Sequence, residues 1–347
     1  MEAQSTTPIY WKTTLSDVEE TLKLVKRGTV TLVARSAGNR PIYKVEYGKS
    51  NLPKSKANLS SALGAGDITC YADKTGEDYV PTVYLAGCIH GGEFEGTMAL
   101  LNLIKMIETG TDYAGNTDKT LLELAERVHL IIMPMCNPDG RSHIPFDDFV
   151  GKSFEDLRYY NQGTWLDGTL CGWPQCKKVH PIKPYVDYLG GYYNDDGVNM
   201  MHDDFFGKMS SEVRAVLDVC LEEAPDFSAL LHGGANTRGC IILPSYASGN
   251  SKEIVLSIAE ANAAKGAPYG LKPGVNRTIY AKENEPTPPS FNLISAMHHC
   301  CGETCVTFES NQGLTYGEFI YTHEQIYRAH TIFFENIFEH IIAKFAK

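Results

Sequence analysis

The sequence predicts an α/β domain in which helices cover both faces of a mixed, mostly parallel, twisted β-sheet. Apolar runs with the length of buried strands alternate with amphipathic segments, which is typical of βαβ units. Several of these runs stop at glycine, histidine or glutamate, and open α/β sheets bind ligands at the carboxyl ends of their strands. The 347 residues allow one large domain or two small ones and can bury a sizeable core. We expect one domain over 1–347.

The first 80 residues are expected to add an N-terminal region to this domain. Apolar residues at helical spacing, followed by two β-rich runs around a Gly-Asn turn, indicate a helix and a hairpin. The polar, turn-rich segment that follows indicates a surface loop or an edge segment. These elements, a helix, two strands and a loop, are expected over 17–27, 29–34, 42–47 and 49–77.

The stretch 82–108 organises the rest of the chain. It begins as an apolar strand that stops at His90, continues through two glycines to Glu93, and becomes an amphipathic helix from about Glu95. This order places one imidazole and one carboxylate together at the carboxyl edge of the sheet.

The remaining elements alternate in the same way. The stretch ending in Asn137-Pro-Asp-Gly140 is a good tight turn in any protein, but its place after a buried strand favours a role in shaping the floor of a cleft, with Asp139 as a hydrogen-bond partner of a metal-bound imidazole. A C-terminal apolar stripe at helical spacing indicates core packing. The predicted helices lie over 121–126, 211–223, 253–265 and 332–345, and the predicted strands over 129–135, 227–232, 241–243 and 304–309.

An irregular insertion over 141–196 separates the two halves of the pattern. Its core, 151–196, is dense in Gly, Tyr, Trp and Pro, and long irregular segments in compact domains are usually functional rims or lids. We expect it to form one wall of a substrate cleft. A possible zinc site within it consists of Cys171, Cys176 and His180. Their spacing fits no common structural-zinc pattern, and a fourth ligand is not evident.

The strand-end residues favour a zinc site. Imidazole nitrogen and carboxylate oxygen are normal Zn²⁺ ligands, and a catalytic site takes three protein ligands while leaving a position for water. His90 and Glu93 supply two, and His232, which ends a second apolar run before paired glycines, is the best third candidate. A fourth run ends at Glu309, a carboxylate suited to acting on water at the metal. Each residue alone is more often an ordinary edge residue; together they favour a metal hydrolase.

In this order the residues resemble the zinc carboxypeptidase family and its related deacylases. The resemblance extends from the segment 34–48, similar to the first hairpin of the family, to the Thr307-Phe-Glu309 motif. Between them lie motifs at 90–93, 137–140, 197–199 and 232. It implies zinc held by His90, Glu93 and His232, with Glu309 as general base and acid. It also implies an arginine beside the oxyanion, for which the candidates are Arg141 and, preferred because of its place in the rim, Arg158.

One departure from the family concerns substrate recognition. Where carboxypeptidases carry an Asn-Arg pair that holds a terminal carboxylate, this chain continues from Asn199 to His202, followed by Asp203 and Asp204. Histidine lacks the bidentate, permanently charged guanidinium, and the acidic pair could even favour an amine. Either another arginine replaces the clamp or the substrate lacks that carboxylate. The candidates are Arg238 and Arg277, and the family's upstream tyrosine has only a poor match in Tyr280.

Three functions therefore remain. The first is a zinc-dependent, metallopeptidase-type hydrolase of amide bonds in peptides or peptide-like substrates. The second is a zinc-dependent deacylase of N-acyl amino acids or small amides. The third is a non-catalytic binding module, which the retention of Glu309 beside a full ligand set argues against.

Composition excludes other classes. The formal net charge of −11 with interspersed signs argues against a nucleic-acid surface, and no apolar run reaches the length of a membrane helix. No secretory signal is visible, so a cytoplasmic location with ten reduced, largely buried cysteines is expected. The oligomeric state is left open.

Overall fold

The computed structural model describes residues 7–244, 247–275 and 291–345, and it confirms the predicted fold class. Within these residues an eight-stranded mixed sheet has the order β1-β2-β4-β3-β7-β10-β8-β9, and β5 and β6 form a separate two-stranded sheet. The strands are β1 (Thr29–Arg35), β2 (Pro41–Tyr47), β3 (Thr82–Gly87), β4 (His129–Met133), β5 (Thr164–Trp165), β6 (Val186–Tyr188), β7 (Phe227–Gly234), β8 (Cys240–Ile242), β9 (Gly274–Val275) and β10 (Thr304–Asn311).

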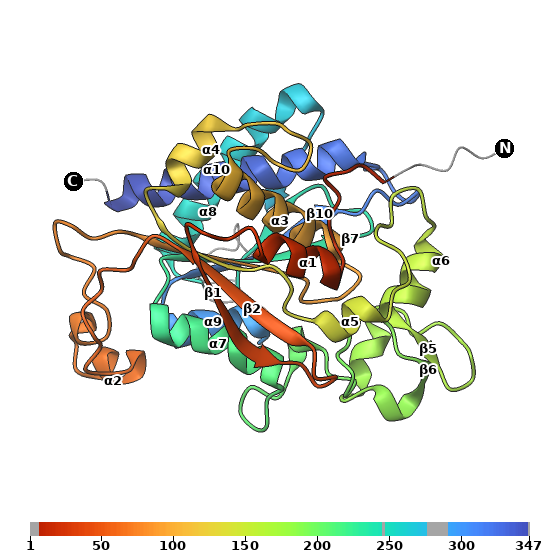
Figure 1. Cartoon of the computed structure of the whole chain (residues 1–347). Helices are drawn as coiled ribbons and strands as arrows, with labels where there is room; N and C mark the ends of the chain where they lie inside the picture. The colour runs from red at the N-terminus through yellow and green to blue at the C-terminus, as the bar shows by residue number, and fades with distance from the viewer. Residues whose placement is uncertain (1–6, 245–246, 276–290, 346–347) are drawn as a thin grey trace.

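Helices cover the large sheet on both faces (Figure 1). The group α3, α4, α8 and α10 lies on one face, and α7 and α9 lie on the other. The helices are α1 (Leu15–Leu22), α2 (Leu59–Gly64), α3 (Phe94–Thr109), α4 (Lys119–Ala125), α5 (Pro138–Ser142), α6 (Phe154–Leu157), α7 (Ser211–Glu223), α8 (Gly249–Gly266), α9 (Leu293–Cys301) and α10 (His323–Phe345).

The central strands are buried on both faces, as strands of parallel sheets are. In β3, Val83 and Leu85 join the larger hydrophobic core with α3, whereas Tyr84 and Ala86 join the core on the α7 side. Strand β3 pairs in parallel with β4 on one side and with β7 on the other, and β7 pairs in parallel with β10. In the sheet, β4 lies on one side of β3, and β7 and β10 lie on the other, so the strand order reverses at β3. At this topological switch point the carboxyl ends of β3, β7 and β10 lie next to one another.

Most predicted elements are present with shifted ends. The helix predicted over 17–27 is α1, which ends at Leu22. It stops there because the chain turns toward α3, where the backbone N–H of Arg27 donates to the Glu108 carboxylate. The segment 49–77, predicted as a loop, contains the short helix α2.

Two local predictions were incomplete. Asn137 caps the short helix α5 with its side chain, accepting from the N–H of Gly140, so the expected turn opens a helix. Helix α9 was not predicted, because nine residues rich in histidine and cysteine give little helical signal. The proline-rich segment before it, 276–290, lies outside the described residues.

All ten cysteines are free thiols, and most of them are buried. Across the described ranges, no helix combines the length and the apolar character that crossing a bilayer requires.

Candidate metal centre

His90 and Glu93 follow β3 through a strained turn. Cys88, directly after the strand, has a φ of 54°, a left-handed conformation that costs a non-glycine residue about 1–3 kcal/mol. The N–H of Asn137 holds it by donating to the Cys88 carbonyl at 2.9 Å. The turn ends at Glu93, which occupies the N-cap position of α3, so the helix start fixes the carboxylate beside the imidazole.

Gly91 lets this turn approach the next βα connection. A Cβ atom at Gly91 would lie 1.9 Å from the carbonyl carbon of Gly140, so any side chain there would collide with the backbone. Its N–H also donates to the Gly191 carbonyl at 2.6 Å. The glycine after the histidine is thus required by packing between the β3 turn, α5 and the segment around Gly191.

His232 and Glu309 are neighbours because their strands are in register. Parallel pairing of β7 with β10 places Glu309 opposite His232, and both project to the face covered by α7 and α9. Residues paired in this way on adjacent strands have side chains on the same face of the sheet. The register therefore sets the Glu309 carboxylate next to the His232 imidazole.

The predicted ligand set converges. One donor atom each from His90, Glu93 and His232 lies within 4.8 Å of the others. The Glu93 carboxylate faces both imidazoles, at 2.8 Å from His90 Nδ1 and 2.6 Å from His232 Nδ1. Donor atoms about 2.1 Å from one ion can be no more than about 4.2 Å apart, so these separations are compatible with one zinc ion.

The tautomer of His90 favours a cation between these atoms. His90 Nε2 lies 3.2 Å from Asn199 Oδ1, an oxygen fixed as an acceptor because it also receives the Met201 N–H at 3.0 Å. We infer that Nε2 carries the proton and that Nδ1 presents a lone pair to the carboxylate. Burial lowers the pKa of His90 below its usual value despite Glu93, so a doubly protonated ring is disfavoured.

Glu93 adds a buried negative charge to the same group. Burial alone would raise its pKa, but His90 and His232 outweigh burial and lower the pKa to about 2. Burial tends to lower the pKa of His232, but Glu93 outweighs burial and raises it, so a proton on this imidazole can balance the buried carboxylate. A divalent metal bound by the same three side chains would take the place of that proton. The residues present therefore fit a divalent metal.

Glu309 differs from Glu93 in its surroundings. Its half-buried side chain faces the cleft, and burial raises the pKa of its carboxyl to about 7, with His232 opposing the shift. A carboxyl that exchanges its proton near neutral pH suits a general base that later acts as an acid.

Two residues orient His90: Tyr192, near the end of the predicted rim, and Asn199, just after it. The Tyr192 ring stacks on the imidazole with centroids 3.7 Å apart, and Asn199 Oδ1 accepts a hydrogen bond from its Nε2. Such partners of a metal-binding histidine fix its ring and its tautomer. Asn199 occupies the motif used for the family resemblance; Tyr192 had no sequence signal beyond its place in the predicted rim.

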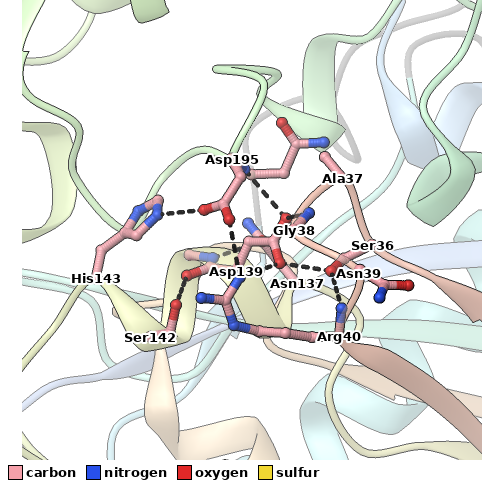
Figure 2. A network of polar contacts seen from close by, with 12 residues as sticks. Ser36, Ala37, Gly38, Asn39, Arg40, Asn137, Asp139, Ser142, His143 and Asp195 are labelled. Carbon is pink, nitrogen blue, oxygen red and sulfur yellow. Dashed lines mark hydrogen bonds and ion pairs between the residues drawn. The ribbon is translucent and has the colours of Figure 1, made fainter.

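A polar network ties this segment to the N-terminal hairpin (Figure 2). Asp139 accepts hydrogen bonds from Ser36 Oγ at 2.5 Å, from Arg40 Nη1 at 2.8 Å and from the backbone N–H of Asp195 at 3.1 Å. The expectation that Asp139 would bond a metal-bound imidazole was wrong, because the turn between β1 and β2 occupies its carboxylate oxygens. Its role is to connect the hairpin with the segment that carries Tyr192.

Replacing Arg40 by methionine is expected to lower the free energy of unfolding by about 2 kcal/mol, because the fully buried Asp139 carboxylate loses its cationic partner. Urea unfolding of the zinc-free protein at pH 7 measures the change. Arg214→Met is the matched control. It removes an exposed i,i+4 pair with Asp218, so its effect should stay below about 0.5 kcal/mol.

The effect of Arg40→Met should shrink in acid. Burial tends to raise the pKa of Asp195, but hydrogen bonds from Arg40 and His143 outweigh burial and lower it. A lowered carboxyl pKa stabilises the fold above the unfolded value of about 3.9, and this stability is lost as pH falls through the folded pKa. The difference between variant and wild type should stay constant from about pH 8 to pH 5 and narrow below about pH 4. An equal difference at pH 3.5 would contradict this assignment.

The metal-ligand group opens into a cavity of about 540 Å³. Four lining residues carry a buried side-chain oxygen that has no hydrogen-bond partner: Asn161, Gln162, Thr307 and Gln312. Buried polar atoms are normally paired, so these oxygens mark where a ligand would donate hydrogen bonds. The rim supplies Trp173 and Lys177 to this lining, so part of the irregular segment borders the cavity.

The structure brings His202 into the cleft but not the expected arginines. His202 lines the cavity, and burial, with Lys177 next in importance, lowers its pKa to about 4. Arg141 is buried in hydrogen bonds to Thr13, Ile144 and Asp147. Neither arginine belongs to the cavity lining, and the Arg158 guanidinium packs against Gly172 of the rim.

The other substrate-binding expectations have different outcomes. Arg238 lies over the Phe319 ring and lines a separate small cavity. Asp203 accepts from the N–H and Oγ of Ser210 before α7 and does not line the cleft. Arg277 and Tyr280 lie outside the described residues.

A second group of potential metal ligands already has a positive partner in the side chain of a lysine. Glu46, His129 and Glu223 approach within 4.8 Å, but Lys44 Nζ lies 3.2 Å from Glu46 and 3.7 Å from Glu223. Within the described ranges these two groups are the metal-ligand clusters, and Cys171, Cys176 and His180 are not among them.

The fold is that of metallo-carboxypeptidases. A metallo-carboxypeptidase from Burkholderia cenocepacia superposes with a TM-score of 0.57 and 15% identity, covering 95% of this chain and 68% of that one. Carboxypeptidase A from Helicoverpa armigera gives 0.54 and 15%, with 99% and 76% covered. A metallo-carboxypeptidase from Pseudomonas aeruginosa, in complex with (2-guanidinoethylmercapto)succinic acid, gives 0.55 and 14%, with 94% and 68% covered.

A family model described as zinc carboxypeptidase matches residues 21–171. This match confirms the resemblance drawn from the sequence motifs over that range, which includes His90 and Glu93 but ends before His232 and Glu309. No curated protein sequence matches the chain.

Proposed function

We propose that the protein is a zinc-dependent, metallopeptidase-type hydrolase of amide bonds in peptides or peptide-like substrates. One observation carries the proposal. The buried side chains of His90, Glu93 and His232 converge as a set that can hold a divalent metal, and Glu309 stands in register beside them at the wall of an open cavity. The zinc carboxypeptidase match and the carboxypeptidase fold support the same reaction class.

In this proposal His90 Nδ1, the Glu93 carboxylate and His232 Nδ1 hold the metal. A zinc ion bound there would supply Lewis-acid activation of water and of an amide carbonyl. Asn199 and Tyr192 keep the His90 ring in the orientation that directs Nδ1 to this position. His232 Nε2 is buried without a protein partner, so its ring is positioned by strand register and by Glu93.

Glu309 performs the proton transfers. Its carboxylate takes a proton from the attacking water while the water oxygen bonds to the amide carbon. The same carboxyl then gives that proton to the leaving nitrogen as the C–N bond breaks. The unpaired oxygens of Asn161, Gln162 and Thr307 accept N–H groups of the substrate and hold the amide in place.

Zinc analysis and peptide hydrolysis test the proposal together. Zinc-loaded protein should retain about one zinc per chain after dialysis, measured by elemental analysis, because three protein ligands converge. A mixture of synthetic peptides, analysed by mass spectrometry, should show cleaved amide bonds. Cleavage should stop with a chelator and return with added zinc. Retention of well under one zinc per chain, or intact peptides with the fully loaded protein, would count against it.

A further inference from the structure

The cleft contains one lysine that the sequence motifs did not single out. Lys177 lies in the rim, in the short 3₁₀ turn Gln175–Lys178, and its ammonium nitrogen is 4.9 Å from the centroid of the Trp173 ring. Both side chains line the cavity that contains the metal-ligand group. The lysine is exposed at the cavity wall, where an incoming substrate can reach it.

The turn that carries Lys177 is fixed by two buried cysteines. Cys171 and Cys176, on either side of Trp173, are buried in a small cluster with Ile182 and Tyr193. The N–H of Cys176 donates to the Gly172 carbonyl at 2.9 Å. Because the residue before it is fixed in this way, Lys177 projects from a held backbone position.

Among the described residues, Lys177 is the one lysine that lines the cavity, and no arginine lines it. Arg141, Arg158 and Arg238 do not line this cavity, as described above. The carboxylates of Glu93 and Glu309 carry at most two negative charges, which a divalent metal would balance, so Lys177 gives the described part of this lining an excess of positive charge. A cleft with that charge favours a substrate bearing one anionic group.

The rest of the lining narrows the class of substrate. The unpaired oxygens of Asn161 and Gln162 are acceptors, and the N–H groups of an amide ligand would be suitable donors to them. A molecule with amide N–H groups and one carboxylate satisfies both features. A small neutral amide would leave Lys177 without an anionic partner.

We propose that Lys177 is the anion-binding, specificity-determining residue of the cleft, and that its ammonium holds a free carboxylate of the amide substrate. The inference rests on the proposed hydrolase function and specifies its substrate class. In this inference a cation from the rim takes the part that the arginine clamp has in the family. Lysine acts here as a single point charge, so it selects the charge of the group with less geometric demand than a bidentate guanidinium.

The test uses one peptide sequence prepared with a free C-terminal carboxylate and as the C-terminal amide. Zinc-loaded wild type should hydrolyse the free acid with the lower KM. Lys177→Met should raise that KM about tenfold, since a charge-assisted contact is lost, while kcat and the KM of the amide stay within about twofold. Lys177→Arg should restore the preference. Lys178→Met, a neighbouring exposed lysine outside the lining, should behave as wild type.

A binding measurement separates this inference from the proposed function. Isothermal titration calorimetry of both peptides with zinc-loaded Glu309→Gln protein, with and without Lys177→Met, requires no turnover. Loss of the free-acid preference in the double variant supports the role of Lys177 even where no peptide is cleaved. Equal binding of the two peptides by Glu309→Gln protein, or a preference that survives Lys177→Met, would overturn the inference, whether or not hydrolysis occurs.

Discussion

Glu309→Gln is expected to lower kcat/KM by about 10³-fold or more while one zinc per chain remains bound. Glutamine has nearly the same shape but does not take up the proton of the attacking water, and general acid–base catalysis contributes about 10²–10⁴-fold. The residue loses both of its proposed proton transfers at once. Its donor atoms are not part of the metal-ligand group, so zinc content should not change. Steady-state kinetics and elemental analysis of the same preparation measure the two quantities.

Glu155→Gln is the matched control for this result. Glu155 is exposed on α6, within the rim, and does not line the cavity, so its replacement should leave kcat/KM within about twofold. Zinc-loaded Glu309→Gln protein with the wild-type rate would remove Glu309 from the mechanism. A loss of zinc from that variant would show instead that Glu309 contributes to holding the metal.

The sequence could predict the candidate site because the site is built on strand ends. His90, His232 and Glu309 each close an apolar run, and parallel strands bring such ends to one edge of a sheet. The pairing of Glu309 with His232 needed the register of β7 and β10, which the two runs alone do not specify. The coarse fold followed from the same alternation of strands and helices.

Residues in irregular segments were harder to assign. Lys177 and Arg158 both lie in the rim, and a sequence without periodicity gives no direction for either side chain. The structure directs Lys177 to the cavity and Arg158 to Gly172. Asp139 was misassigned because its partners, Ser36 and Arg40, are about 100 residues away in the hairpin, and only tertiary packing shows that they occupy its oxygens.

Glu93→Gln is expected to weaken zinc binding by more than about 100-fold, a larger loss than the about 10- to 100-fold typical of changes outside the ligand set. The substitution removes the negative charge that faces both imidazoles. Zinc at about 100 times its dissociation constant should stabilise wild type by about 2.7 kcal/mol, because ligand binding to the native state adds to its stability. At that zinc concentration the variant should be stabilised by less than about 0.4 kcal/mol, seen as a small shift in thermal unfolding.

The zinc-free proteins should also differ in stability. Without metal, the lowered pKa of Glu93 means that the folded protein favours the ionised carboxylate, which pairs with the His232 imidazole. The neutral amide lacks this ion pair, so zinc-free Glu93→Gln should be less stable than zinc-free wild type at pH 7. Glu95→Gln is the control, since Glu95 is equally buried in the same helical turn but lies outside the ligand group, and it should retain one zinc per chain. If Glu95→Gln lost zinc as completely as Glu93→Gln, the effect would come from packing of the turn, and the assignment of Glu93 as a ligand would fail.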